Sequence, residues 1–253
     1  MNRILLASAV ALLSGTAFAA DMGTRVARTA LPAPAPYRSW TGCYVGAHVG
    51  AGWSRTTFTD ANGTVIPAGS DIRANGGANV VGGAQIGCDY EFAKNWVIGA
   101  AGDFTWANIE GQASDPFFAN KSGPITLQSR TKSLASVTGR LGYAFDTFLL
   151  YGKGGVAWSR SQYDVNNWSC ALFTTCSPTG SSTRTGWTAG IGAEWPIAPS
   201  WTLMIEYDHY AFGTKALTLV DASNPAFPLT MNVKQDNDVV KVGLNYRFGS
   251  LLR

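Results

Sequence analysis

The sequence predicts an all-β fold, an eight-stranded antiparallel transmembrane β-barrel with short periplasmic turns and long extracellular loops. Three observations predict it: apolar and polar residues alternate in eight segments, aromatic residues end the apolar faces, and the connections alternate between short and long. The composition agrees, because 29 of 253 residues are glycine and only 14% are charged, against roughly 25% in soluble domains. The net charge of +3 comes from dispersed residues, which argues against a nucleic-acid partner.

The chain begins with the three-part pattern of a secretory signal peptide. The positive Arg3 precedes an apolar run over residues 4–15, and a small-x-small sequence ends at Ala19. This order predicts export and cleavage after Ala19, which makes residues 1–19 the signal peptide. The mature protein is then expected in a compartment that permits disulfides.

The mature chain is expected to contain a tail, a barrel and a short extension. Residues 20–39 hold prolines at alternate positions, a pattern typical of an extended chain, and we expect them to form a periplasmic N-terminal tail. No later stretch reaches the roughly 18 apolar residues of a membrane helix. We therefore expect the barrel over residues 40–248 and a C-terminal extension over residues 249–253.

Eight segments each carry one face free of charge and one polar or glycine-rich face. In the first, Val45, Val49 and Trp53 share a face, and Tyr44 and His48 lie on the other. This period of two predicts β-strands. The eight segments are 43–53, 80–91, 96–106, 135–145, 148–159, 187–195, 201–208 and 240–248.

Aromatic residues at the ends of the apolar faces favour a membrane barrel over a soluble one, whose large rings would lie in mid-strand. The residues beside short turns are Tyr90, Trp96, Phe145, Phe148, Trp195, Trp201, Tyr246 and Phe248. At the opposite ends are Trp53, Trp106, Trp158 and Trp187. Two such girdles are typical of the two membrane interfaces.

The connections between segments alternate in length. Short turns are expected at residues 93–95, 146–147 and 196–200. The remaining connections, near 55–78, 107–128, 161–184 and 210–237, each have about twenty residues. This layout is typical of outer-membrane barrels, with the short turns in the periplasm and the long loops outside.

The predicted lumen is only wide enough for side chains, because eight strands enclose little more. Many inward positions are glycine, which makes room for long polar neighbours. Five inward charged residues lie about six or seven residues from the nearest short turn: Asp103, Arg140, Lys153, Glu206 and Lys241. We expect them to form a lumen charge cluster of ion pairs that plugs the barrel, since an unpaired buried charge is costly. An ion path lined by the same groups is the alternative.

The four cysteines suggest two disulfides. Cys170 and Cys176 lie in one long connection, and Cys43 and Cys88 lie on the outward faces of neighbouring antiparallel segments. Metal binding is the rival interpretation, but the sequence has only two histidines and no C-x-x-C spacing. We expect no metal site and no cofactor.

Candidates for catalysis are few, and the sequence predicts that the protein is not an enzyme. His48 faces the lumen, and His209 lies near the outer rim beside Asp208. A lipid A-modifying enzyme is an alternative that His209 alone would support, because no serine–histidine pattern accompanies it. Arg55 and Arg160 lie near the outer rim, where they would meet lipid phosphates or simply extend toward water.

The chain resembles the small outer-membrane β-barrel proteins of rhizobia and their relatives, called outer membrane immunogenic proteins or porin-family proteins. The matching blocks are WTGCYVG (40–46), GGAQIG (82–87), VTGRLGY (137–143), LYGKGGVA (150–157), GWTAGIGAE (186–194) and VGLNYRF (242–248). The resemblance implies an eight-stranded barrel in the outer membrane, inserted by the barrel-assembly machinery, with no catalytic residues to carry over. Tyr246 and Phe248 resemble the family's assembly signal, although five more residues follow here.

These observations predict an integral protein of the outer membrane with a structural and surface-exposed role in the envelope. Its expected partners are outer-membrane lipid, including lipopolysaccharide, and the assembly machinery during insertion. A small-solute porin is the main alternative function.

Overall fold

The computed structural model describes residues 39–248 apart from 61–67, 121–122, 172–173 and 227. The predicted signal peptide, most of the tail and the C-terminal extension lie outside the described residues. Every described element is a β-strand. None of the described segments forms a helix of the length and hydrophobicity needed to cross a membrane. The strands are β1 (Gly42–Thr59), β2 (Asp71–Asn75), β3 (Asn79–Phe92), β4 (Trp96–Asn120), β5 (Gly123–Ala144), β6 (Leu149–Asn166), β7 (Trp168–Ala171), β8 (Thr174–Cys176), β9 (Thr179–Ala198), β10 (Trp201–Leu219) and β11 (Leu229–Phe248).

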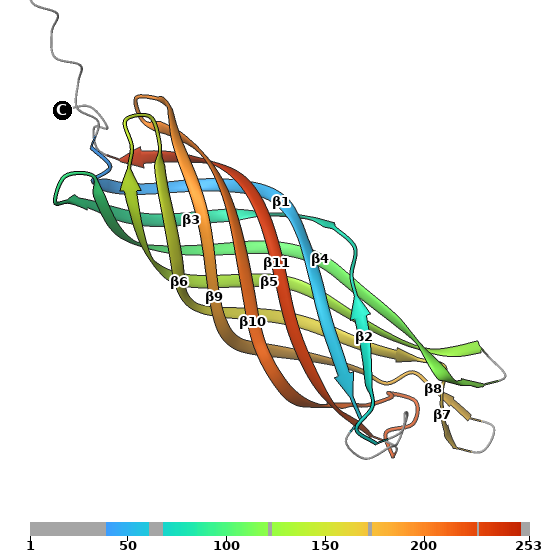
Figure 1. The fold of residues 1–253 in the computed structure, drawn as a ribbon. Helices are drawn as coiled ribbons and strands as arrows, with labels where there is room; N and C mark the ends of the chain where they lie inside the picture. The colour runs from blue at the N-terminus through green and yellow to red at the C-terminus, as the bar shows by residue number, and fades with distance from the viewer. Residues whose placement is uncertain (1–38, 61–67, 121–122, 172–173, 227, 249–253) are drawn as a thin grey trace, which may run out of the picture. The chain divides into compact units, whose positions relative to one another are not determined.

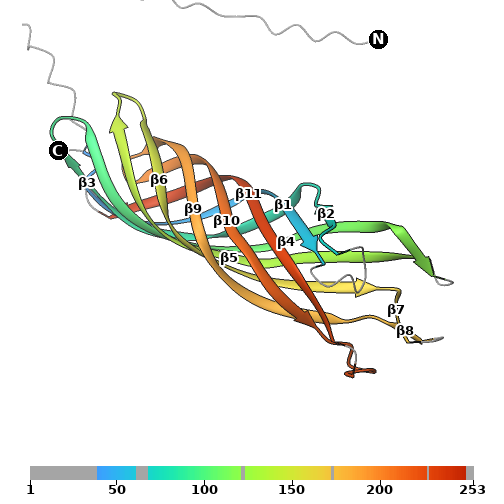
Figure 2. The same ribbon diagram turned by 60° about the horizontal axis from the view of Figure 1, so that its bottom comes forward.

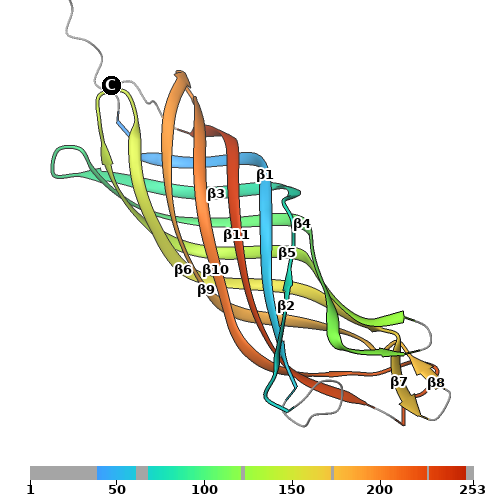
Figure 3. The same cartoon turned by 45° about the vertical axis from the view of Figure 1, so that its right-hand side comes forward.

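Eight of these strands close into an antiparallel ring (Figure 1). Its order is β1, β3, β4, β5, β6, β9, β10 and β11, and β11 pairs again with β1 from Cys43–Phe248 to Thr59–Asn232. The short strand β2 pairs with β1, and its ladder with β4 consists of Asn75–Gln112. Figure 3 shows β2 beside β1, away from the end where β1 begins. The predicted eight-stranded fold is confirmed.

Three short turns lie at one end of the ring, which we call the turn-side end. Two of them are at or near the predicted positions, because β3 ends at Phe92 before β4 begins at Trp96, and β5 ends at Ala144 before Leu149. Ala93, Lys94 and Asn95 all have positive φ, between 43° and 77°, a left-handed turn without glycine. The third turn is shorter than predicted, because β9 continues through Pro196 to Ala198.

The predicted long connections are mostly not loops, and this part of the prediction is wrong. β4 and β5 have 25 and 22 residues and run on together to the far end of the ring (Figure 2). β10 and β11 likewise stay paired out to Leu219–Leu229. Strand pairing continues there because alternate residues bury apolar side chains inside the ring.

The belt of Trp53, Trp106, Trp158 and Trp187 divides the ring into two halves. Between this belt and the short turns lies the turn-side half, where apolar side chains point outward, as predicted: Val49 is 58% exposed and Ile191 is 64% exposed. Beyond the belt lies the far half, where the pattern reverses. Its interior is an apolar cluster of Phe58, Ile72, Ala74, Ile125, Leu127, Tyr163, Val165, Cys176, Leu217, Leu219, Leu229, Met231 and Val233.

Candidate functional site

The lumen of the turn-side half holds two layers of ionised side chains. In the layer nearer the turns, Arg140 of β5 and Arg247 of β11 lie between Asp89 of β3 and Glu194 of β9. Arg140 Nε donates to Asp89 at 2.6 Å, and Arg247 Nη2 lies 2.9 Å from Asp89 and 3.0 Å from Glu194. Arg140 Nη1 is 3.3 Å from Glu194. The four side chains are 0–3% exposed, and their two positive and two negative charges balance.

Aromatic rings complete this arginine layer. The Arg140 guanidinium lies 5.0 Å from the Tyr44 ring centroid and 4.7 Å from that of Tyr151. Arg247 lies 4.9 Å from the ring of Trp40 and donates to its carbonyl oxygen at 3.2 Å. Cation–π contacts strengthen when water is excluded. The rings therefore stabilise the two cations of the layer.

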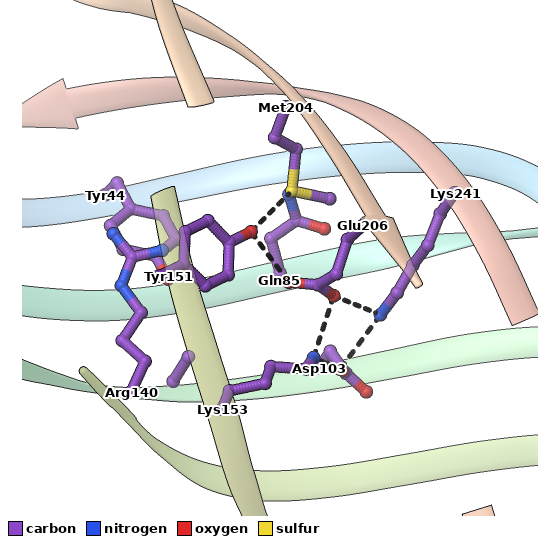
Figure 4. Close-up of a pocket in the computed structure, with 10 residues that line it drawn as sticks. Tyr44, Gln85, Asp103, Arg140, Tyr151, Lys153, Met204, Glu206 and Lys241 are labelled. Carbon is purple, nitrogen blue, oxygen red and sulfur yellow. Dashed lines mark hydrogen bonds and ion pairs between the residues drawn. The ribbon is translucent and has the colours of Figure 1, made fainter. Parts of the chain in front are cut away.

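The second layer is built from lysines (Figure 4). Lys153 Nζ of β6 lies 3.3 Å from Asp103, 2.8 Å from Glu206 and 3.0 Å from Asp208. Lys241 Nζ of β11 lies 3.1, 3.0 and 2.7 Å from the same three carboxylates. Each ammonium thus contacts three carboxylates, and all five side chains are at most 7% exposed.

The structure brings together four of the five residues of the predicted lumen charge cluster and adds Asp208 to them. Arg140 lies in the arginine layer instead, so its predicted place is wrong. The physical reason is the register, in which Arg140 is opposite the like-charged Lys153 on one side and Gly99 on the other, with Asp89 beyond that glycine. Arg140 therefore reaches across Gly99 to Asp89.

Glycine between two opposite charges recurs in both layers. A Cβ on Gly99 would lie 2.2 Å from an oxygen of Asp89, and one on Gly190, between Lys153 and Asp208, would lie 2.2 Å from Asp208. A Cβ on Gly192 would lie 2.5 Å from the ring of Tyr151. The prediction that inward glycines make room for long polar side chains is confirmed. Each charge–glycine–charge row crosses three strands, so it becomes visible only when their register is known.

Very little space remains between the layers. The cavity there has a volume of about 20 Å³ and is lined by residues of both layers, including Tyr151 and Lys153. Such a volume holds about one water molecule. The Tyr151 side chain lies between the layers, and its hydroxyl donates to Glu206 at 2.8 Å (Figure 4).

His48 joins the lumen network rather than a catalytic group. Its Nδ1 lies 2.5 Å from Gln85 Oε1, and its Nε2 lies 2.9 Å from Thr105 Oγ1. Gln85 in turn donates to Asn245 at 2.7 Å. The partners of His48 are thus an amide and a hydroxyl, and Asn245 connects them to Glu194 of the arginine layer by donating to its carboxylate at 3.1 Å.

The three carboxylates of the lysine layer lie close enough together to bind a cation, with their oxygens within 4.8 Å of one another. Lys153 and Lys241 already contact all three. The two ammonium groups thus occupy the position that a metal ion would need.

Above the lysine layer, toward the belt, the lumen is again apolar. This cluster comprises Val81, Ile109, Leu134, Ala157, Tyr210, Phe212 and Val239. Hydroxyl and amide groups follow, and Gln235 links Thr131 at 2.7 Å to Tyr163, whose hydroxyl donates to it at 2.5 Å. Arg184 lies there with 2% exposure and donates to the Val233 carbonyl oxygen at 2.7 Å.

His209 lies on the outer surface at the belt and has an acidic partner that the sequence analysis missed. Its Nδ1 lies 2.8 Å from Asp238 on β11, and Asp238 also accepts from Tyr207 at 2.7 Å and pairs with Arg55. His209 and Asp238 are opposite each other in the register, which a strand alignment would have shown. Within the described residues, no serine or cysteine side chain forms a hydrogen bond with His209.

The two predicted disulfides differ in outcome. Cys43 and Cys88 are opposite each other on β1 and β3 and are bonded, with sulfurs 2.06 Å apart, so this disulfide is confirmed. Cys176 is also disulfide-bonded. The side chain of Cys170 lies outside the described residues, and the Cys170–Cys176 pairing stays a prediction.

The residues of the expected assembly signal lie at the end of β11. Tyr246 and Phe248 point outward, 38% and 55% exposed, and their ring centroids are 5.2 Å apart. Both belong to the girdle beside the turn-side end. Their role in assembly stays a prediction.

Known proteins resemble this chain over nearly its whole length. Residues 7–248 match the family described as outer membrane protein beta-barrel domain. The 31 kDa outer-membrane immunogenic protein of Brucella melitensis is 31% identical over 257 residues, covering 98% of this chain and 100% of the relative. The 25 kDa outer-membrane immunogenic protein of Brucella abortus is 28% identical over 250 residues and 97% of each chain.

A solved structure shares the fold. The outer membrane protease OmpT of Escherichia coli superposes with a TM-score of 0.50 at 11% identity, covering 82% of this chain and 97% of OmpT. At that identity only the fold is shared. The family match and the Brucella relatives together show that the chain belongs to the outer membrane β-barrel family and is a protein of the outer membrane.

Proposed function

We propose that the protein is a non-conducting structural barrel of the outer membrane, whose turn-side half anchors it in the lipid and whose far half is displayed outside the cell. The filled lumen carries this proposal. The arginine layer, the lysine layer and the apolar cluster above them leave a cavity of only about 20 Å³ between the charged layers.

The energetics of the charged layers support a plug rather than an ion path. An ion path would require Lys153 and Lys241 to leave carboxylates that lie 2.7–3.3 Å away. Breaking a buried pair costs about 3–5 kcal/mol. A small solute would also have to displace Tyr151, which is 3% exposed.

Planar-bilayer recordings of the folded protein test the proposal. We expect no unitary current steps, because the filled lumen excludes a water column. The folded state is verified separately by the shift in gel mobility between unheated and heated samples. Reproducible single-channel steps from folded protein would favour the small-solute porin.

A lipid A-modifying enzyme is the second candidate, and the His209–Asp238 contact of 2.8 Å favours it. A carboxylate beside histidine is the orienting half of a hydrolytic triad. Tyr207 and Arg55 share the same carboxylate, which favours a structural role for the group. Mass spectrometry of lipid A from cells with wild-type protein or the His209→Ala variant decides between them, since only an enzyme would alter the acyl pattern.

A further inference from the structure

The outer surface has a hollow where the Trp106 side of the belt meets the far half. It has a volume of about 420 Å³, and its lining includes Phe104, Trp106, Lys132 and Arg160. Binding sites for small molecules commonly have about 300–1,000 Å³. The hollow is therefore large enough for a substantial ligand group.

The lining separates into an apolar part and a cationic part. Phe104 and Trp106, which are 40% and 63% exposed, pack edge to face with ring centroids 5.0 Å apart. Lys132 and Arg160 lie on the next strands, in the direction of the far half. The arrangement matches an amphiphile with an apolar chain and an anionic group.

Irregular pairing places Lys132 at this hollow. The β4–β5 register shifts between Trp106 and Ile109, and the β5–β6 register shifts between Thr131 and Ser133. Lys132 is the residue left without a partner in both ladders, and its side chain is exposed. Bulges commonly redirect a side chain at a barrel rim.

Lys132 and Arg160 lack the carboxylate partners that Arg55 and Arg130 have. Arg55 pairs with Asp238, and Arg130 pairs with Glu110 at 2.8 Å. For Lys132 and Arg160, no ion pair exists within the part of the chain that the structure describes. Two cations that line one hollow without a counter-charge repel each other, and a bound anion would relieve this repulsion.

We propose that this hollow binds a phosphorylated glycolipid of the outer leaflet, with a phosphate of the lipid A head group between Lys132 and Arg160 and an acyl chain against Trp106 and Phe104. The proposal rests on the proposed orientation, in which the far half lies outside the cell. Lysine and arginine are the usual phosphate partners. Tryptophan at this depth suits the boundary between head group and acyl chain.

Native mass spectrometry of refolded, lipid-free protein titrated with bisphosphorylated lipid A tests the site. We expect one tightly bound lipid for the wild type and a Kd raised about tenfold or more by Lys132→Gln with Arg160→Gln, because two charged hydrogen-bond donors are lost. The matched control is Arg73→Gln with Lys94→Gln, which removes the same charge away from the hollow and should leave the Kd unchanged. Equal Kd values for the two double variants would overturn the proposal.

Three further ligands identify what is bound. Dephosphorylated lipid A should bind the wild type as weakly as lipid A binds the Lys132/Arg160 variant. Phosphatidylglycerol binding as tightly as lipid A, or displacement of lipid A by inorganic phosphate, would reject the assignment to a glycolipid. The heated-gel shift verifies folding of each variant. A conducting barrel would refute the structural role without affecting this binding result.

Discussion

The turn-side half and the far half of the barrel use the same strands but opposite polarity. Along β6, outward positions are Val156 and Trp158 in the turn-side half and then Arg160, Gln162 and Asp164 in the far half. β6 pairs with β9 without a register shift, so the strand does not turn over. In the proposed orientation, what changes is the environment outside the barrel, which is lipid around the turn-side half and water around the far half.

The comparison indicates that the hydrophobic effect makes the interior of a barrel apolar only where water surrounds the barrel. In the far half, Tyr163 and Val165 are 0% and 1% exposed and pack in an apolar core. In the turn-side half, burying apolar side chains in the lumen gains little over exposing them to lipid. Ion pairs fill the lumen there, and they require partners because each charge is out of water.

Charge reversal in the lumen should cause the largest loss of stability, since it breaks the ion pairs that fill the turn-side half. Arg140→Glu would place three carboxylates, with Asp89 and Glu194, around one remaining guanidinium. We expect a loss of at least about 3–5 kcal/mol, seen as loss of the heat-modifiable band. Arg73→Glu on the exposed surface is the control. A normal band for Arg140→Glu would show that the arginine layer is dispensable.

A matched pair of leucine truncations should separate the two halves. Leu127, in the far-half core, is 0% exposed, whereas Leu203, on the lipid-facing surface, is 36% exposed. Leu127→Ala should cost about 2–5 kcal/mol through a cavity, and Leu203→Ala much less. Limited proteolysis from outside should cut the far half of Leu127→Ala faster while its heated-gel shift persists. Similar proteolysis of both variants would mean that the far-half interior contributes little.

The sequence predicted the turn-side half well because its signals are local. The alternation of apolar and polar residues predicted which side chains of each strand point outward. The aromatic residues at the strand ends marked the turns at 93–95 and 146–147. The outward positions of Cys43 and Cys88 on neighbouring strands led to their disulfide. Each of these inferences needs only the period of two and the order of the strands.

The far half was mistaken for loops because its outward faces consist of charged, amide and hydroxyl residues. The inward apolar residues alternate with them, as Leu229, Met231 and Val233 do on β11, but the expectation of apolar faces outside hid this pattern. The division of the lumen charges into two layers could not be predicted from the sequence either. It depends on the register across Gly99 and Gly190, which one strand alone does not determine.

Arg184 sharpens the comparison, because it is a buried cation of the far half without the carboxylates that its counterparts have. It donates to the carbonyl oxygens of Val233 and Gly213 at 2.7 and 3.5 Å and lies 5.4 Å from the ring of Tyr163. Arg184→Met should change stability by less than about 1 kcal/mol or increase it, since a buried charge is replaced by apolar packing. Urea titration of the heated-gel shift, against Arg140→Met as the destabilised reference, measures this. A loss as large as that of Arg140→Met would contradict it.

The smallest expected effect concerns hydrogen bonds at the tip of the far half whose strength depends on pH. Asp221 follows β10 and accepts from the backbone N–H groups of Ser177 at 2.5 Å and Ser223 at 2.7 Å, and these bonds lower the pKa of Asp221. A carboxyl with a depressed folded pKa stabilises above its unfolded pKa of about 4, and that contribution disappears as pH falls through the folded pKa. Amide hydrogen exchange at Ser177 should therefore be slow near neutral pH and lose protection in acid.

Asp221→Asn removes the ionised acceptor, so protection at Ser177 should be weaker at neutral pH and lose its dependence on acid. Asp146→Asn in a turn at the opposite end removes the same charge and should leave Ser177 unaffected. Exchange at each pH must be compared with the intrinsic rate of the unfolded chain, which itself changes with pH. Retained acid sensitivity in Asp221→Asn would assign the change to other carboxylates of the far half. Loss of the acid sensitivity in Asp221→Asn would show that the Asp221 side chain alone holds the β10–β11 connection against the segment before β9.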